Sequence, residues 1–113
     1  MNIDDMKYGE LKQIAAMFGT FRGVEPAHPL LNKNCIVRTV TMIFTGRLTQ
    51  VTPTDLVLVD CSWIPDTDRY MQFVANGSVK ECEPYPNGMP VYINRGALLD
   101  MCELRKELPR SQK

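Results

Sequence analysis

Hydrophobic and polar positions follow their most regular pattern between residues 36 and 61, where Val, Ile, Leu, Thr and Phe predominate. These side chains suit strands, because the χ1 angles of the branched ones are already restricted. Gly46 predicts a bulge or a sharp bend, and Thr52-Pro53-Thr54-Asp55 predicts a turn. Between these signals we expect strands at residues 36–44, 47–51 and 56–61. A short, strongly bent antiparallel meander of this kind is typical of small barrels.

Two other segments have helical patterns. Apolar residues return at helical spacing in residues 4–18, which we expect to form an N-terminal helix. Residues 66–77 are expected to form a short helix, with Asp66 or Thr67 as its N-cap and Gly77 at its end. The side chains of this second helix that would pack inward are Tyr70, Phe73 and Val74.

Strand patterns return after this helix. Residues 78–85 favour a strand, and Asn87-Gly88 predicts a tight turn that folds residues 89–93 back against it as a hairpin. Residues 97–103 are expected to form the last strand. The end of the chain has a local excess of Lys and Arg, which we interpret as a frayed, solubilising tail rather than a contact surface.

The chain has 113 residues, of which 44% are hydrophobic and 23% charged, and these values are typical of one soluble globular domain. No apolar run approaches the roughly 20 residues of a membrane helix, and the polar start of the sequence is unlike a signal peptide. We therefore expect a cytoplasmic protein without membrane contact. The 13 basic and 13 acidic residues cancel, so nucleic-acid binding would need local clusters of Lys and Arg.

Residues with catalytic or metal-binding chemistry are sparse. His28 stands alone in a connector, and we interpret it as a solvated loop residue. An enzyme with a divalent metal would need carboxylates to gather, and the candidates are Asp55, Asp60, Asp66 and Asp68. Helix capping and solvation at strand ends explain these aspartates better. The cysteines lack the paired spacing of zinc sites, so we expect neither a metal nor a cofactor. We interpret the four cysteines as small buried thiols: Cys35, Cys61, Cys82 and Cys102.

Two short motifs resemble the signatures of the Sm-like (LSm) family. The first is Gly46-Arg47-Leu48 followed by Thr54-Asp55-Leu56-Val57-Leu58-Val59-Asp60-Cys61, which is similar to the family's glycine and leucine before a loop and its Leu-Val-Leu-x-Asp run. The second is Val91-Tyr92-Ile93-Asn94-Arg95-Gly96-Ala97-Leu98-Leu99, an apolar strand that ends in Arg-Gly before another apolar strand. The motifs occur in the family's order and cover residues 36–61 and 89–103.

The resemblance implies a mainly β fold: a small, strongly bent, five-stranded antiparallel Sm-like barrel with an N-terminal helix and an inserted short helix plus hairpin. Residues 1–113 would form a single domain. Its parts would be the N-terminal helix (1–19), a connector (20–34), strands one to three (35–63), an insertion (64–88), strands four and five (89–103) and a basic tail (104–113).

Sm-like proteins form rings in which the fourth strand of one subunit pairs with the fifth strand of the next. For this chain the resemblance implies a cyclic homo-oligomer of roughly five to seven subunits. A ring also has a physical reason, because an open barrel leaves unpaired strand edges that cyclic pairing would satisfy. The implied interface residues are Met89, Val91, Ile93, Leu98 and Met101.

The family binds single-stranded RNA near the pore of the ring, through the turn before the third strand and through the Arg-Gly turn. Arg95, repeated around a ring, would form a positive collar able to hold phosphates or stack on bases. Asp55 departs from the family's usual Asn, and an ionised aspartate can only accept hydrogen bonds. The turn also lacks the usual aromatic or histidine side chain for stacking. The binding residues that the resemblance implies are Thr52, Thr54, Asp55, Asn94, Arg95 and Gly96.

We therefore expect a non-enzymatic Sm-like ring that binds single-stranded nucleic acid, RNA before DNA. Arg47, Lys33 and the basic tail are further candidates for phosphate contact. The alternative is a structural or adaptor protein of a phage or bacterial assembly that does not bind nucleic acid. In that case the insertion would supply the contact surface, with aromatic anchors among Trp63, Tyr70, Phe73, Tyr85 and Tyr92.

Overall fold

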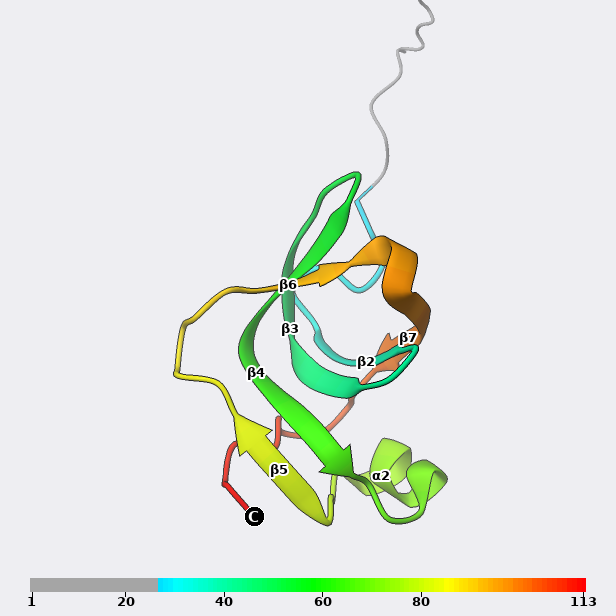
Figure 1. The fold of residues 1–113 in the computed structure, drawn as a ribbon, viewed down its shortest axis with the longest axis vertical. Coiled ribbons are helices and arrows are strands. Elements are labelled where there is room, and N and C mark those ends of the chain that lie inside the picture. The colour runs from blue at the N-terminus through cyan, green and yellow to red at the C-terminus, as the bar shows by residue number, and fades with distance from the viewer. Residues whose placement is uncertain (1–26) are drawn as a thin grey trace, which may run out of the picture.

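The computed structural model describes residues 27–113, so the helix expected at residues 4–18 lies outside the described residues. The described part is mainly β, as expected, with six antiparallel strands and one α-helix (Figure 1). The elements are β2 (Asn34–Thr39), β3 (Ile43–Val51), β4 (Asp55–Asp66), α2 (Tyr70–Asn76), β5 (Glu81–Pro84), β6 (Val91–Asn94), the 3₁₀ turn η1 (Arg95–Ala97) and β7 (Leu98–Glu103). Between residues 27 and 113 no helix has the length and apolar composition needed to cross a bilayer.

All the described strands belong to one curved sheet. Their order is β5-β4-β3-β2-β7, and β6 also pairs with β4. This is possible because β4 is long: β6 pairs with its residues 55–58, and β5 with its residues 62–66. Across the described chain β6 and β7 do not pair with each other, so the sheet is open and does not close into a barrel within one chain (Figure 1).

The strand expected at residues 36–44 is present but interrupted: β2 ends at Thr39, the chain turns at residues 40–42, and β3 begins at Ile43. Thr39 stabilises this turn: its backbone N–H donates to the carbonyl of Met42 (2.8 Å), and its hydroxyl accepts the N–H of Met42 (3.0 Å). A local bond from a side chain to the backbone thus outweighs the strand propensity of Val40 and Thr41.

Gly46 lies at a bulge in β3, which confirms the expected bend. The register between β3 and β4 shifts between Thr45 and Arg47. A Cβ atom at residue 46 would lie 2.9 Å from Cβ of Leu58, so β4 approaches this closely only because residue 46 has no side chain. Bulges increase the local twist, which curves β3 around the core.

Strand β4 was expected to end at residue 61, but it continues through Pro65 to Asp66. The register between β4 and β5 shifts between Trp63 and Asp66, so the proline occupies an irregular point of the ladder. As a result β4 runs from the central strands into the segment that the sequence assigned to the insertion.

Helix α2 forms inside the expected range but begins later than expected. Its N-cap is Arg69, which makes no side-chain capping bond, so the expected cap at Asp66 or Thr67 is wrong. Gly77 ends the helix with a φ of 78°, as expected. The three side chains expected to pack inward are confirmed. Phe73 is fully buried, and Tyr70 and Val74 are partly buried against the same cluster.

The hairpin expected between residues 78–85 and 89–93 is wrong as well. β5 and β6 pair with opposite ends of β4 and not with each other. Near the expected turn, the N–H of Gly88 donates to the carboxylate of Asp60 (3.1 Å). Val91 and Ile93 pack with the first core cluster, and this burial outweighs the local turn signal.

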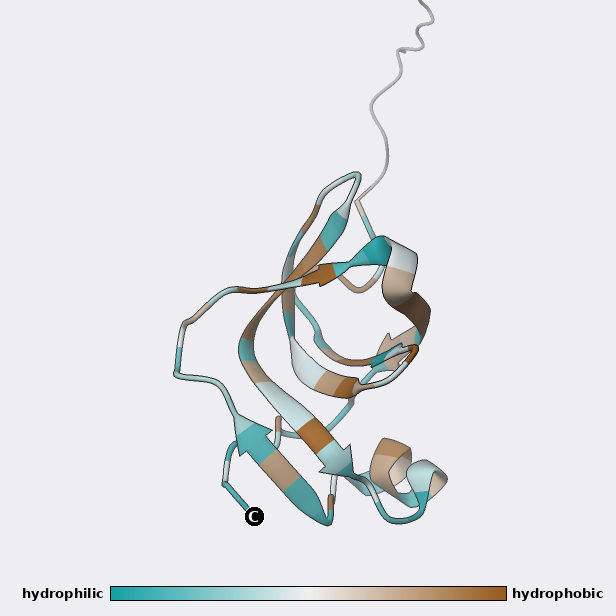
Figure 2. Ribbon diagram, in the orientation of Figure 1, coloured by the Kyte–Doolittle hydropathy of each residue, from teal (hydrophilic) through white to brown (hydrophobic). Residues whose placement is uncertain are grey.

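Two hydrophobic clusters hold the sheet together. Val37 belongs to the first and its neighbour Ile36 to the second, so the clusters lie on opposite faces of β2. Hydrophobic stretches of β4, β6 and the start of β7 stand out in Figure 2. The end of the chain covers the second cluster with buried Leu104 and partly buried Leu108, so the expected frayed tail is wrong.

Candidate functional site

The six binding residues implied by the sequence come together at one end of the sheet. The turn before β4 lies beside η1, because Asp55 at the start of β4 is paired with Asn94 at the end of β6. We call this group the Arg95 site, and its members are Thr52, Thr54, Asp55, Asn94, Arg95 and Gly96.

Two hydrogen bonds to the turn hold Arg95 in place. Its backbone N–H donates to the carbonyl of Thr54 (2.9 Å), and its guanidinium Nη1 donates to the carbonyl of Thr52 (2.8 Å). Arg95 is nevertheless exposed. The bond to Thr52 is the one hydrogen bond that its side chain makes among the described residues, and it uses only part of the donor capacity of a guanidinium. The geometry therefore orients a positive charge at the surface without neutralising it.

Asn94 and Gly96 shape the turn that carries Arg95. The Oδ1 atom of Asn94 accepts the N–H of Gly96 (2.7 Å), which caps η1 at its start. A Cβ atom at residue 96 would lie 2.9 Å from that same oxygen, so a larger residue would displace the cap. These two residues act on the conformation of the Arg95 turn.

Asp55 lies in the same site and carries the opposite charge. Its backbone N–H donates to the hydroxyl of Thr52 (2.9 Å), which closes the turn, and its carboxylate accepts the hydroxyl of Thr54 (2.8 Å). Asp55 therefore partly offsets Arg95 within one chain. Positive potential sufficient for a polyanion would require several copies of Arg95 near one another.

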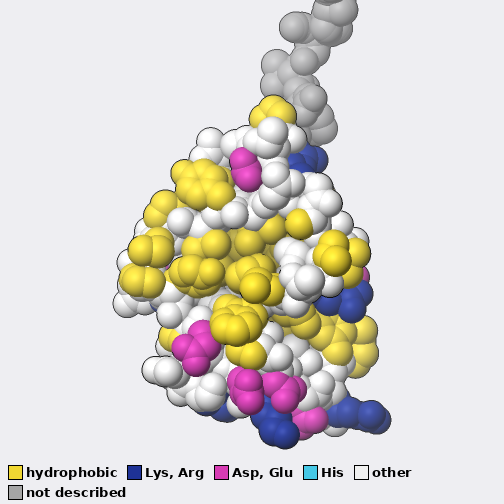
Figure 3. All heavy atoms as spheres, in the orientation of Figure 1, with side chains coloured by type: hydrophobic (Ala, Val, Ile, Leu, Met, Phe, Trp, Pro, Cys, Tyr) yellow, Lys and Arg dark blue, Asp and Glu magenta, His cyan; other side chains and the backbone are white. Residues whose placement is uncertain are grey.

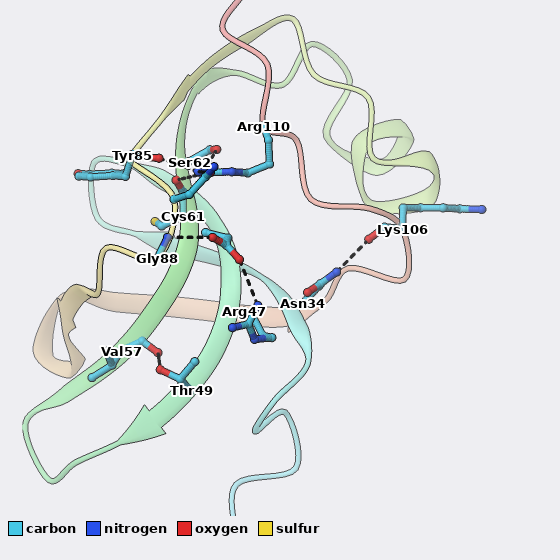
Figure 4. A network of polar contacts seen from close by, with 12 residues as sticks. Asn34, Arg47, Thr49, Val57, Cys61, Ser62, Tyr85, Gly88, Lys106 and Arg110 are labelled. Carbon is cyan, nitrogen blue, oxygen red and sulfur yellow. Dashed lines mark hydrogen bonds and ion pairs between the residues drawn. The ribbon is translucent and has the colours of Figure 1, made fainter.

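The other cations proposed as phosphate contacts lie elsewhere. Arg47 pairs with Asp60 (3.2 Å). Arg110, in the tail, donates to the carbonyls of Cys61 and Tyr85, the latter at 2.6 Å, and is directed into the fold in Figure 4. Lys33 lines a separate hollow together with Arg105 and Lys106. Arg95 is thus the only one of these proposed contacts that belongs to the Arg95 site.

Four of the five implied interface side chains belong to the protomer's own core. Ile93 is buried in the first cluster, and three partly buried residues pack against that cluster: Val91, Leu98 and Met101. Only Met89 is exposed, to 43%. The exposed apolar side chains of β6 and β7 are instead Tyr92 and Leu99, each 63% exposed. Alternation along a strand could have identified Tyr92, since it falls between two core positions.

The geometry does not bring the acidic or sulfur side chains together. Within residues 27–113 no group of three or more His, Cys, Asp or Glu side chains could hold a metal ion, so the four candidate aspartates do not form one site. Burial raises the pKa of Cys35 to about 11 and that of Cys61 to about 12, so these thiols stay protonated. Cys82 is also buried, which confirms small buried thiols at three of the four positions.

His28 is a candidate binding residue that the sequence did not identify. It lines a hollow of about 590 Å³ together with Arg95, Gln50 and Val51, whereas the sequence suggested only a solvated loop. The connector reaches this position because the N–H of Asn32 donates to the carbonyl of Leu48 (2.6 Å). No local pattern predicts this tertiary contact.

Comparison of the chain with protein-family models, with curated proteins and with solved structures finds no match. The resemblance to the Sm-like family therefore rests on the two sequence motifs.

Proposed function

We propose that the protein is a non-enzymatic Sm-like ring that binds single-stranded nucleic acid, RNA before DNA, at the Arg95 site. The observation that supports this most directly is the position of Arg95, which two hydrogen bonds hold beside the Thr52–Asp55 turn while it remains exposed. A guanidinium oriented in this way suits phosphate and the faces of bases. Because Asp55 partly offsets the charge of Arg95 within one chain, the proposal requires assembly.

The open edges of the sheet support assembly. Among the described residues β6 pairs only with β4, and β7 only with β2, so each has one edge without a strand partner. Unpaired edges tend to pair with another chain. Pairing β6 of one copy with β7 of the next would satisfy both edges in a cyclic arrangement and would complete a barrel-like surface.

Exposed apolar side chains lie next to both edges. Tyr92 on β6 follows exposed Met89, and Leu99 on β7 is exposed as well. Figure 3 shows hydrophobic side chains gathered across the face that carries β6. Contiguous exposed apolar surface of this kind is uncommon on a monomer and favours a protein–protein contact.

Binding is tested with labelled oligo-U and oligo-A, measured by fluorescence anisotropy at several salt concentrations. We expect the affinity of Arg95→Ala to fall at least about tenfold, with a weaker dependence on salt. Lys80→Ala is the matched control, since Lys80 is an exposed cation just before β5, at the far end of β4 from η1 (Figure 1). Equal affinities of the two variants, or no salt-dependent binding by the wild type, would contradict the proposal.

Assembly is tested separately by size exclusion with light scattering. We expect Tyr92→Asp and Leu99→Asp each to prevent ring formation, because a charge at either edge would be buried in the interface. Mixing the two variants should restore one good interface per pair and give heterodimers. Met71→Asp is the control, since Met71 is 70% exposed on α2. A monomeric wild type would rule out the ring.

The adaptor function remains the second candidate, and one surface favours it. A groove of about 370 Å³ between the 40–42 turn and the end of β4 is lined by Met42, Trp63 and Pro65. Trp63 is 38% exposed, and large aromatic side chains often anchor protein interfaces. Two results together would favour the adaptor over the nucleic-acid ring. The wild-type ring would bind neither oligonucleotide, and a protein that co-purifies with the wild type would be lost from Trp63→Ser.

A further inference from the structure

The hollow beside Arg95 has the composition of a site for a small planar ligand. Its volume of about 590 Å³ lies within the range of small-molecule sites. Leu31 and Val51 line the hollow, and both pack against the first core cluster, so the core holds the apolar wall of the hollow in position. Gln50 and Arg95 provide polar groups at the same hollow. An apolar wall with a few polar groups is typical of sites that orient a ring.

His28 has a fixed orientation in this hollow. The N–H of Leu30 donates to its Nδ1 atom (3.0 Å), and the residue is partly buried. Since Nδ1 accepts a hydrogen bond, the proton of the neutral imidazole is on Nε2. His28 therefore presents a flat ring with a defined donor, which is the kind of side chain that the Thr52–Asp55 turn lacks.

The neighbouring polar side chains differ in whether their hydrogen-bonding groups are already used within the fold. The hydroxyl of Thr49 already donates to the carbonyl of Val57 (3.2 Å). Gln50, the next residue of β3, is exposed, and its amide can both donate to and accept from the edge of a base. Arg95 brings the positive charge, so the hollow combines a ring, an amide and a guanidinium.

We propose that this hollow binds one nucleobase of the strand, with His28 stacking on the base, Gln50 hydrogen-bonding its edge and Arg95 contacting the adjacent phosphate. The proposal rests on the proposed function, since it names the subsite that would hold a base in a nucleic acid bound at Arg95. Stacking on a ring tolerates any base, whereas the Gln50 amide would distinguish between bases.

The test compares an oligo-U with an abasic oligonucleotide of the same length, measured by fluorescence anisotropy. His28→Asn keeps an acceptor for the N–H of Leu30 but removes the ring, while His28→Phe keeps a ring. We expect His28→Asn to weaken oligo-U binding about fivefold to a hundredfold and to leave abasic binding unchanged. His28→Phe should keep most of the oligo-U affinity, and Arg95→Ala should lose affinity for both probes.

The results separate this inference from the proposed function. Oligo-U binding that depends on Arg95 but is the same in His28→Asn and the wild type would overturn the base site alone. An equal loss on both probes in His28→Asn would also overturn it, because no base contact would then be involved. A wild type that binds neither probe would overturn the proposed function together with the inference. Gln50→Ala, at an exposed position, should change the ratio of oligo-U to oligo-A affinity while the fold is retained.

Discussion

Two arginines, one bonded to the turn before β4 and one bonded to β4 itself, show how differently the same side chain is used. Arg110 is partly buried and donates to two carbonyls, to the hydroxyl of Ser62 (3.3 Å) and to the side chain of Asn87 (2.7 Å). Arg95 is exposed, and within the described part of the chain its side chain makes one hydrogen bond, to the carbonyl of Thr52. The number of internal acceptors, and not the residue type, indicates which cation is structural and which is free to bind a ligand.

The aspartates near these arginines differ in the same way. Asp60 accepts the N–H of Gly88 and pairs with Arg47 (Figure 4), and these contacts, with the Gly88 bond first, lower the pKa of its carboxyl. Asp60 also has a φ of 51°, uncommon for a residue other than glycine. Among residues 27–113, the Asp55 carboxylate accepts one hydrogen bond, from the hydroxyl of Thr54. The Asp60–Arg110 region thus fixes the 85–88 loop and the tail, whereas the Arg95 site leaves its guanidinium exposed.

The largest expected effect follows from removing Arg110. Arg110→Ala should lower the free energy of unfolding by about 3 kcal/mol, because several charge-assisted hydrogen bonds are lost and the carbonyls of Cys61 and Tyr85 lose their donor. Urea denaturation followed by circular dichroism measures this. Arg105→Ala is the control, since the Arg105 side chain is 84% exposed on the same tail. Similar stabilities of the two variants would show that Arg110 is not structural.

A smaller effect, of opposite sign, is expected at Thr45. Thr45 is paired with Ser62, whose hydroxyl donates to the carbonyl of Pro109 in the tail (2.7 Å). Thr45 is fully buried, and within the described chain its hydroxyl has no hydrogen-bond partner. Thr45→Val should therefore stabilise the fold by about 1 kcal/mol, since an unsatisfied buried hydroxyl is replaced by a methyl group. Thr49→Val, which removes a bonded hydroxyl, should destabilise it. Thermal denaturation measures the stability of each variant relative to the wild type. If Thr45→Val were destabilised, the Thr45 hydroxyl would have to make a hydrogen bond in the folded protein after all.

Features of the fold that depend on local chemistry were predictable from the sequence. The Thr52–Asp55 turn, the bulge at Gly46 and the end of α2 at Gly77 each follow from residue types whose backbone preferences are strong. The turn at Thr39 was also local, but its signal was hidden among strand-forming residues. Local signals therefore predicted most of the described elements, with errors at their ends and with the turn at residues 40–42 missed.

Pairing across the chain could not be predicted in the same way. Asn87-Gly88 does form a turn, with a φ of 75° at Gly88, but β6 pairs with β4 and not with β5. Two contacts favour this pairing: Ile93 is buried in the first cluster, and the N–H of Gly88 donates to Asp60. The spacing of Leu104 and Leu108 hinted at a packed tail among its basic residues. Grouping of the Arg95 site followed from the family resemblance, whereas the position of His28 depends on tertiary contacts alone.

The acid sensitivity of the fold tests the structural role of Asp60. Because its folded pKa lies below the ordinary value, Asp60 contributes stability that is complete above an unfolded pKa of about 4 and is lost as the pH falls through the folded pKa. The stabilities of the wild type and Asp60→Asn should therefore differ at pH 7 and converge below about pH 4. Arg47→Gln should reduce this pH dependence only in part, since the larger contribution, the Gly88 bond, remains. A stability difference that is independent of pH would contradict this role.

The smallest expected effect on stability is at Arg95, and it completes the comparison with Arg110. Arg95→Ala should change the free energy of unfolding by less than about 0.5 kcal/mol, because the side chain is exposed and its backbone bond to Thr54 does not depend on it. Urea denaturation under the conditions used for Arg110→Ala measures the difference. A residue that affects binding strongly and stability hardly at all is available for a ligand. If Arg95→Ala destabilised the fold as much as Arg110→Ala, the Arg95 guanidinium would instead have a structural role in the Thr52–Asp55 turn. Any loss of binding would then reflect a changed conformation of that turn.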